Sequence, residues 1–88
     1  MGETLSGPAC RAARGLLEWN VRDLCSAASV SPNTVGRLEA GKGIGPDPSA
    51  RILGAFAAHG VQLLADGRPG ARVSDPERFA QSVATKRS

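Results

Sequence analysis

A short stretch from residue 20 to residue 41 constrains the fold most, because its residues predict two short helices joined by a tight turn. Asn20 is a favourable N-cap residue, so the first of these helices should begin beside it, at Val21. Its apolar and small side chains recur at helical spacing and predict one inward face: Leu24, Cys25 and Ala28. We expect this helix to end at about Ala28.

The second helix of the pair has a clear start signal. Ser31 can cap the helix with its hydroxyl, and Pro32 suits the first helical position, where no amide hydrogen bond is lost. Val35 and Leu38 should face inward, and Gly41 should end the segment. The outward residues are small, polar or positively charged: Pro32, Asn33, Thr34, Gly36 and Arg37. A helix with such a face suits close approach to a DNA groove.

Further helices are expected on both sides of this pair. Pro8 opens one that reaches about Glu18, and its apolar side is formed by Ala9, Ala12, Ala13, Leu16 and Leu17. Trp19 should cover the core where this helix meets the next. Asp47 and Pro48 repeat the signal of a cap followed by proline, so another helix is predicted from Pro48 to His59. Its inward side chains are Ile52, Leu53, Phe56 and Ala57.

After Gly60 the pattern changes from helical to extended. Residues 61–65 and 71–73 can form two strands, and the segment between them is rich in turn formers. A hairpin of this length is only marginally stable alone, so it should pair with something. Asp75, Pro76 and Glu77 then start a last short helix, which ends in a basic tail at Lys86 and Arg87.

These elements predict one small, mainly α domain. A chain of 88 residues buries only a modest core, and its aliphatic, alanine-rich composition favours packed short helices over a sheet. We expect four to five short helices followed by a short C-terminal β strand or hairpin. The expected divisions are a flexible arm at 1–7, the helical domain at 8–60, the β element at 61–74, and the last helix with its basic tail at 75–88.

Charge and aromatic content favour duplex DNA as the partner. The net charge of +3 favours an anionic partner, although many solvated surfaces carry as much. With two phenylalanines, one tryptophan and no tyrosine, the chain lacks the stacking platform of proteins that bind single strands. No apolar run has membrane-spanning length and residues 1–4 do not start a signal peptide, so we expect a cytoplasmic protein without a membrane partner.

Catalysis and metal binding are not expected. Cys10 and Cys25 lie on inward helix faces without histidine or cysteine at metal-ligand spacing, so both are interpreted as small core residues. The only histidine, His59, lies near a helix end, where a cation is favourable, and no nucleophile has a base at recognisable spacing. We therefore predict a protein that is not an enzyme and has no catalytic residue, cofactor or metal.

The residues from Asn20 to Gly41 resemble the helix-turn-helix of the Cro/cI-like (XRE) regulators. The usual pattern has a polar cap, a leucine in the first helix, a valine-serine turn and a closing leucine-glutamate-x-glycine. Here these positions are Asn20, Leu24, Val30, Ser31, Leu38, Glu39 and Gly41. The likeness extends upstream to Arg11 and downstream to Val61. It implies a lambda-repressor-like fold and a homodimeric transcriptional regulator, by default a repressor, which binds an inverted repeat in double-stranded DNA.

The resemblance also implies which residues meet the DNA. The base-facing positions are Pro32, Asn33, Gly36 and Arg37, and the expected phosphate contacts are Asn20, Arg22, Ser31, Thr34, Lys42 and Gly43. Asn33 suits an adenine edge and Arg37 suits guanine. The glycine-rich loop after Gly41 can bring backbone amides to a phosphate or can simply connect two helices. Many members have a phosphate-binding glutamine at the position of Val21, so that contact is not expected here.

Two further expectations come from the same resemblance. Glu39 should pair with Arg14 of the first helix in a structural ion pair, with Arg11 as the alternative partner. The β element should hold the dimer by strand pairing between subunits, through Val61, Leu63, Leu64 and Val73. The alternative function is an antitoxin that also represses its own operon, with a toxin or RNA polymerase as a protein partner. The size of the chain suits a regulator of a phage or mobile element, and we expect a bacterial or phage-encoded protein associated with the nucleoid.

Overall fold

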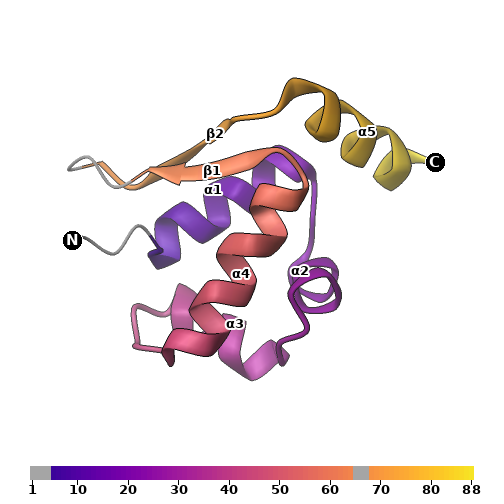
Figure 1. Ribbon diagram of the computed structural model, residues 1–88. Helices are drawn as coiled ribbons and strands as arrows, with labels where there is room; N and C mark the ends of the chain where they lie inside the picture. Colours follow the sequence, from indigo (N-terminus) through magenta and orange to yellow (C-terminus); the bar gives the residue numbers. More distant parts are fainter. Residues whose placement is uncertain (1–4, 65–67) are drawn as a thin grey trace.

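In the computed structural model, residues 5–64 and 68–88 are described, and they form five helices and one hairpin (Figure 1). The helices are α1 (Gly7–Leu17), α2 (Val21–Ala28), α3 (Pro32–Glu39), α4 (Pro46–Ala58) and α5 (Pro76–Arg87), and the strands are β1 (Val61–Leu64) and β2 (Gly70–Val73). The prediction of a small, mainly α fold with a short C-terminal hairpin is confirmed.

The hydrophobic core lies between α1, α2, α3, α4 and the hairpin. Its buried side chains are Leu5, Ala9, Cys10, Ala13, Leu17, Leu24, Ala28, Val35, Leu38, Ile52, Ala55, Phe56, Val61 and Leu63. Trp19 lies over this core, as predicted, and its ring stacks on Phe56 with 5.8 Å between the ring centroids. The helical spacing in the sequence therefore identified most of the inward residues.

Four of the helices begin with the side-chain cap that local chemistry favours. Ser6, Asn20, Ser31 and Asp75 each accept a hydrogen bond from the backbone amide three residues later. A proline follows the cap closely in α1, α3 and α5, where the first-turn amides have no intrahelical partner. These caps fix where the chain enters each helix.

Helix α4 begins earlier than predicted, at Pro46 rather than Pro48. Gly45 is its N-cap and makes no side-chain hydrogen bond, while Asp47 lies in the first turn and forms an ion pair with Arg51, Nε–Oδ2 3.1 Å. The first turn accommodates both prolines because its amides are unpaired in any helix. The signal of an acid followed by proline thus identified the helix but not its first residue.

The N-terminal segment differs in part from the expected arm at 1–7. Residues 1–4 lie outside the described residues, but Leu5 is buried in the core and Gly7 already belongs to α1. Gly7 packs so closely that a Cβ there would lie 2.8 Å from the carbonyl oxygen of Leu38. Residues 5–7 therefore do not belong to a flexible arm, because this contact requires Gly7 to lie against the end of α3.

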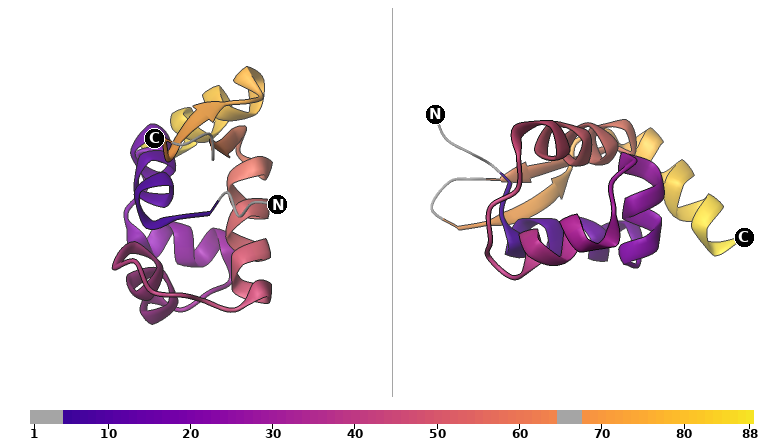
Figure 2. Two further views of the ribbon diagram at one scale, coloured as in Figure 1. Left: turned by 90° about the vertical axis from the view of Figure 1, so that its left-hand side faces the viewer. Right: turned by 90° about the horizontal axis from the view of Figure 1, so that it is seen from below.

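The hairpin packs on the helices of the same chain. Strands β1 and β2 are antiparallel, with Val61 opposite Val73 and Leu64 opposite Gly70. Both strands lie against α1, and β1 also contacts α4, as Figures 1 and 2 show. These helices supply the packing that an isolated hairpin lacks. The end of the predicted first strand, residue 65, and the turn residues 66 and 67 lie outside the described residues.

Helix α5 extends from the hairpin along the end of the molecule opposite α3 (Figure 1). None of its residues is buried, although Phe79 packs partly against the core. Among the residues that the structure describes, no helix has both the length and the apolar character needed to cross a membrane.

Candidate nucleic-acid interface

Helix α3 presents the four predicted base-facing residues on one exposed face. Val35 and Leu38 point into the core, whereas Pro32, Asn33, Gly36 and Arg37 are all exposed. Positions four apart lie on the same side of an α-helix, so Pro32 with Gly36 and Asn33 with Arg37 form two adjacent rows on the exposed surface. The space beside Gly36 is open, because a Cβ added to this residue would meet no heavy atom within 4 Å.

The turn between α2 and α3 fixes the start of this face. Ser29 ends α2 in the left-handed conformation, φ 56°, and its carbonyl accepts a hydrogen bond from Arg51 of α4 at 3.0 Å. Ser31 caps α3 through the amide of Thr34, and the two hydroxyl oxygens lie 3.0 Å apart. The two predicted phosphate ligands therefore lie together at the N-terminus of α3, where their hydroxyl groups also hold the turn.

A group of basic and backbone groups lies at the other end of α3. Gly41 has φ 83°, a conformation that favours glycine, and turns the chain back beside the helix. The Lys42 amide then donates to the Arg37 carbonyl at 2.9 Å, and the Arg37 guanidinium donates to the Gly43 carbonyl at 3.3 Å. Arg37, Lys42 and Gly43 are exposed, so the structure brings one predicted base contact beside two predicted phosphate contacts.

The N-terminus of α2 is more occupied than the sequence suggested. Asn20 and Asp23 form a reciprocal capping box, with N–O distances of 2.8 and 2.9 Å, and Asp23 also accepts from Lys86 of α5 at 2.7 Å. The hydrogen bonds from Lys86 and the Asn20 backbone hold the pKa of Asp23 below its usual value. A phosphate at this end would therefore meet the exposed Arg22 and the remaining free amides rather than the amide of Asp23.

The predicted ion pair between Arg14 and Glu39 is confirmed. It is bidentate, with Nε–Oε2 2.8 Å and Nη2–Oε1 2.9 Å, and Arg14 also donates to the Trp19 carbonyl at 3.1 Å. Arg11, the alternative partner, donates instead to the Glu39 backbone carbonyl at 2.7 Å. Two arginines of α1 therefore hold the C-terminal end of α3, and thereby its angle to the rest of the domain.

Cys10 completes this network, a role that sequence reasoning missed. Its thiol donates to Glu39 Oε2 at 3.3 Å, and burial, together with that carboxylate, raises the pKa of Cys10 to about 12. Burial also disfavours ionisation of Glu39, but the hydrogen bonds from Arg14 and Cys10 outweigh it and lower the pKa of Glu39. The spacing of positions 10, 11 and 14 on one helix face was the signal that could have revealed the network. A thiol kept protonated in this way is a poor nucleophile.

The predicted dimer residues divide into two groups. Val61 and Leu63 are 1% and 5% exposed, because their side chains belong to the core of this chain. Leu64 is half-buried, and Val73 is the one large hydrophobic residue found exposed in the described part of the chain. Strand pairing uses the backbone, so the hairpin edges and Val73 are the groups available to a second subunit.

The chain was also compared with known proteins. No protein family, curated protein or solved structure gave a significant match. The functional assignment therefore depends on the residues of this chain and on their geometry.

Proposed function

We propose that this protein is a transcriptional regulator that binds specific duplex DNA through α3, with repression by promoter occlusion as its mode of action. The observation that carries the proposal is the exposed face of α3, on which Asn33 and Arg37 flank the open space beside Gly36. The capped turn before α3 and the ion pair of Arg14 with Glu39 after it hold both ends of this helix.

Base recognition would use the two longest polar side chains of this face. The amide of Asn33 matches the donor and acceptor of an adenine edge, and the Arg37 guanidinium matches the two acceptors of guanine. Each good bidentate pair contributes about 1–3 kcal/mol of discrimination. One long hydrogen bond holds the Arg37 guanidinium beside the Gly43 carbonyl, and a contact with guanine would replace this bond.

Phosphate contacts would position α3 in the groove. Lys42 and the Gly43 backbone lie at one end of the face, and Ser31 and Thr34 lie at the other. Contacts of this kind set orientation and the salt dependence of binding, whereas they carry no sequence information.

Selection of bound sequences from a random duplex pool tests this proposal directly. We expect an enriched motif, and we expect Arg37→Ala to flatten preference at one base pair of each half-site. Lys42→Ala should instead weaken binding to all sequences and reduce the salt slope by about one unit. Arg87→Ala is the matched control, because Arg87 lies on α5, outside both α3 and the hairpin, and pairs with Glu18. No enrichment, or equal losses for Arg37→Ala and Arg87→Ala, would reject the assignment.

A homodimer would let two copies of α3 read an inverted repeat. One recognition helix contacts few base pairs, and two copies should lie about 34–36 Å apart along one DNA face. Val73→Lys places a charge on the exposed face of the hairpin and should weaken both dimerisation and preference for the palindrome. Ala80→Lys on exposed α5 is the control, and sedimentation equilibrium measures both variants. If Val73→Lys stays dimeric, the interface lies outside the hairpin.

A further inference from the structure

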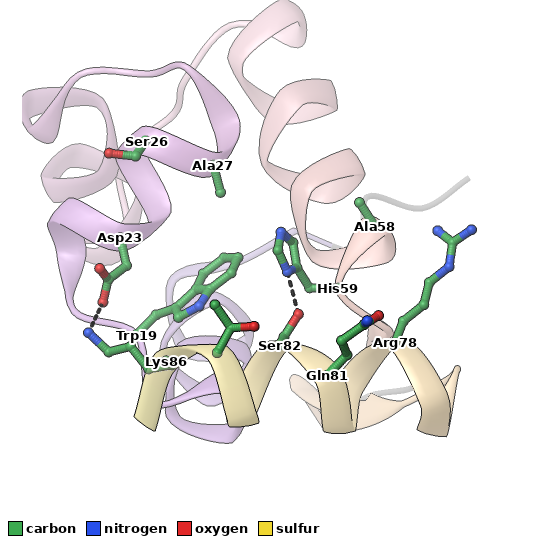
Figure 3. Close-up of a pocket in the computed structure, with 11 residues that line it drawn as sticks. Trp19, Asp23, Ser26, Ala27, Ala58, His59, Arg78, Gln81, Ser82 and Lys86 are labelled. Atoms are coloured by element: carbon green, nitrogen blue, oxygen red, sulfur yellow. Dashed lines mark hydrogen bonds and ion pairs between the residues drawn. The ribbon is translucent and has the colours of Figure 1, made fainter. Parts of the chain in front are cut away.

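A pocket lies between α2, α4 and α5 (Figure 3), and α5 is at the end of the molecule opposite α3 (Figure 1). Its volume is ≈ 680 Å³, within the range of small-molecule sites. None of the residues assigned to base contact lines it, so the DNA-binding proposal leaves this pocket unexplained.

Two aromatic rings form the base of the pocket. Trp19 and His59 meet edge to face, with ring centroids 4.8 Å apart, and Trp19 also stacks on Phe56. Ala27 of α2 and Ala58 of α4 line the walls, and their small side chains leave the space above the rings open (Figure 3). A rigid aromatic base between small side chains suits a flat ring.

One polar atom of this base is directed into the pocket. His59 Nδ1 is hydrogen-bonded to the Ser82 hydroxyl of α5, which fixes the orientation of the imidazole. Figure 3 shows the second ring nitrogen on the opposite side, facing the space between Ala27 and Ala58. When the hydroxyl of Ser82 donates to Nδ1, Nε2 carries the proton and can donate to an acceptor on a ligand.

The charged residues around the pocket favour an anion. Lys86 and Arg78 line it from opposite parts of α5, and Asp23 is the carboxylate among the lining residues. Asp23 is already neutralised by Lys86 at 2.7 Å. Arg78 pairs with Asp75 at a longer 3.5 Å and is well exposed. Figure 3 shows its guanidinium directed away from His59, so Arg78 would turn toward the pocket to reach a ligand at the rim. Because Lys86 and Asp23 offset each other, Arg78 is the source of the positive charge among the lining residues.

We propose that this pocket binds a planar aromatic carboxylate. The ring would lie in the space above Trp19 and His59, between the two alanines, His59 Nε2 would donate to a carboxylate oxygen, and Arg78, turned toward the pocket, would supply the charge. Guanidinium and carboxylate groups form the strong, charge-assisted type of hydrogen bond. Ligand binding is independent of the proposed function, because it is measured on the protein without DNA.

Trp19 makes the test direct, because it is the only tryptophan in the chain and its ring lies in the pocket. Benzoate is the probe, and its binding is measured by tryptophan fluorescence and by ¹⁵N–¹H chemical shifts. We expect a saturable change in fluorescence, with the chemical-shift changes concentrated in α2, the end of α4 and α5. Benzamide lacks the charge and cyclohexanecarboxylate lacks the flat ring, so each should bind at least about tenfold more weakly, the loss expected when one such interaction is removed.

Two variants locate the site and separate its two features. Ala27→Leu fills the space above Trp19 and should abolish the benzoate response; it changes an exposed residue, and its thermal unfolding checks that it folds. Arg78→Gln should weaken benzoate binding but not benzamide binding, while Arg72→Gln, on the distant β2, should change neither. No saturable response, equal affinity for benzoate and benzamide, or an unchanged response in folded Ala27→Leu would each overturn the proposal.

Discussion

Helices α3 and α5 begin with the same chemistry but are held by different means. Ser31 caps α3 and Asp75 caps α5, and a proline follows each cap. Helix α3 buries Val35 and Leu38, whereas α5 buries no residue. The comparison teaches that a cap followed by proline decides where a helix begins, while buried side chains decide how firmly it is held.

The ion pairs at the C-terminal ends of the two helices differ in solvent exposure, and the pair at α3 is the better shielded one. At the end of α3, the side chains of Arg14 and Glu39 are 17% and 14% exposed, and further hydrogen bonds surround them. Near the end of α5, Arg87 pairs with Glu18 and Lys86 pairs with Asp23, and all four side chains are more exposed than the α3 pair. Solvent screens exposed pairs strongly, so they stabilise a helix weakly.

Close packing at its first turn also holds α5. The carbonyl of Gly60 accepts from the amides of Ser74 and Asp75 at 2.8 and 3.2 Å. Gly60 has φ 79°, and a Cβ at this position would lie 2.7 Å from the Phe79 amide nitrogen. The start of α5 is thus fixed against the end of α4, and the rest of the helix depends on surface contacts.

The largest expected effect comes from removing an aromatic ring in the helical body. Phe56 is fully buried, so Phe56→Ala should lower the free energy of unfolding by about 3–5 kcal/mol. Phe79 is half-buried near the start of α5, so Phe79→Ala should lower the free energy of unfolding clearly less. It should also leave the α3 amides protected from hydrogen exchange. Urea unfolding of both variants gives the comparison. Equal losses would mean that α5 belongs to the same cooperative core as α3.

Gly60→Ala should have the next largest effect and should act on α5. The substitution forces a positive φ on alanine and a clash with the backbone of α5, which together cost about 2–4 kcal/mol. Hydrogen exchange should show the loss of protection in α5 first. Gly54→Ala in α4 is the matched control: it is exposed, a Cβ there meets nothing within 4 Å, and alanine should stabilise the helix by about 0.5–1 kcal/mol. Destabilisation by both substitutions would contradict this interpretation of Gly60.

Glu39→Gln tests the shielded ion pair that holds α3. Loss of its charge-assisted hydrogen bonds should cost about 2 kcal/mol at pH 7. The folded pKa of Glu39 lies below its ordinary value of 4.5, so its stabilising contribution is fully present above that pH and is lost as the pH falls through the folded pKa. The stability difference between the wild-type protein and Glu39→Gln should therefore shrink below pH 4.5. A difference that stays constant down to pH 2 would show that this carboxylate contributes no pH-dependent stability.

Local sequence signals predicted the start of α2 and α3 because the relevant chemistry lies within a few residues. Asn20 and Ser31 cap the helices predicted from them, and the exposed face of α3 follows from its helical spacing. The start of α4 was missed because Pro46 and Pro48 both suit a first turn, and neither Gly45 nor Asp47 provides a side-chain cap.

Contacts between distant segments were harder to predict. The resemblance identified Arg14 as the partner of Glu39, but it did not include Cys10, which lies one turn before Arg14 on α1 and donates to the same carboxylate. The hairpin was expected to need a partner, and the structure places it on α1 of the same chain. The pocket is formed by three helices that are separated in sequence, so no local pattern predicts it.

The smallest expected effect is the loss of the pair between Lys86 and Asp23, which joins α5 to α2. Lys86→Met, Asp23→Asn and the double variant form a thermodynamic cycle, which cancels the contribution of Asp23 to the α2 cap. We expect a coupling energy of about 0.5 kcal/mol at low salt. It should approach zero in 1 M NaCl, where the Debye length is about 3 Å. Glu39→Gln should keep most of its effect in the same salt, because its partner is shielded. A salt-resistant coupling above about 1.5 kcal/mol, the range of a charge-assisted hydrogen bond, would show that α5 is held as firmly as α3 and that the contrast between the two helices is wrong.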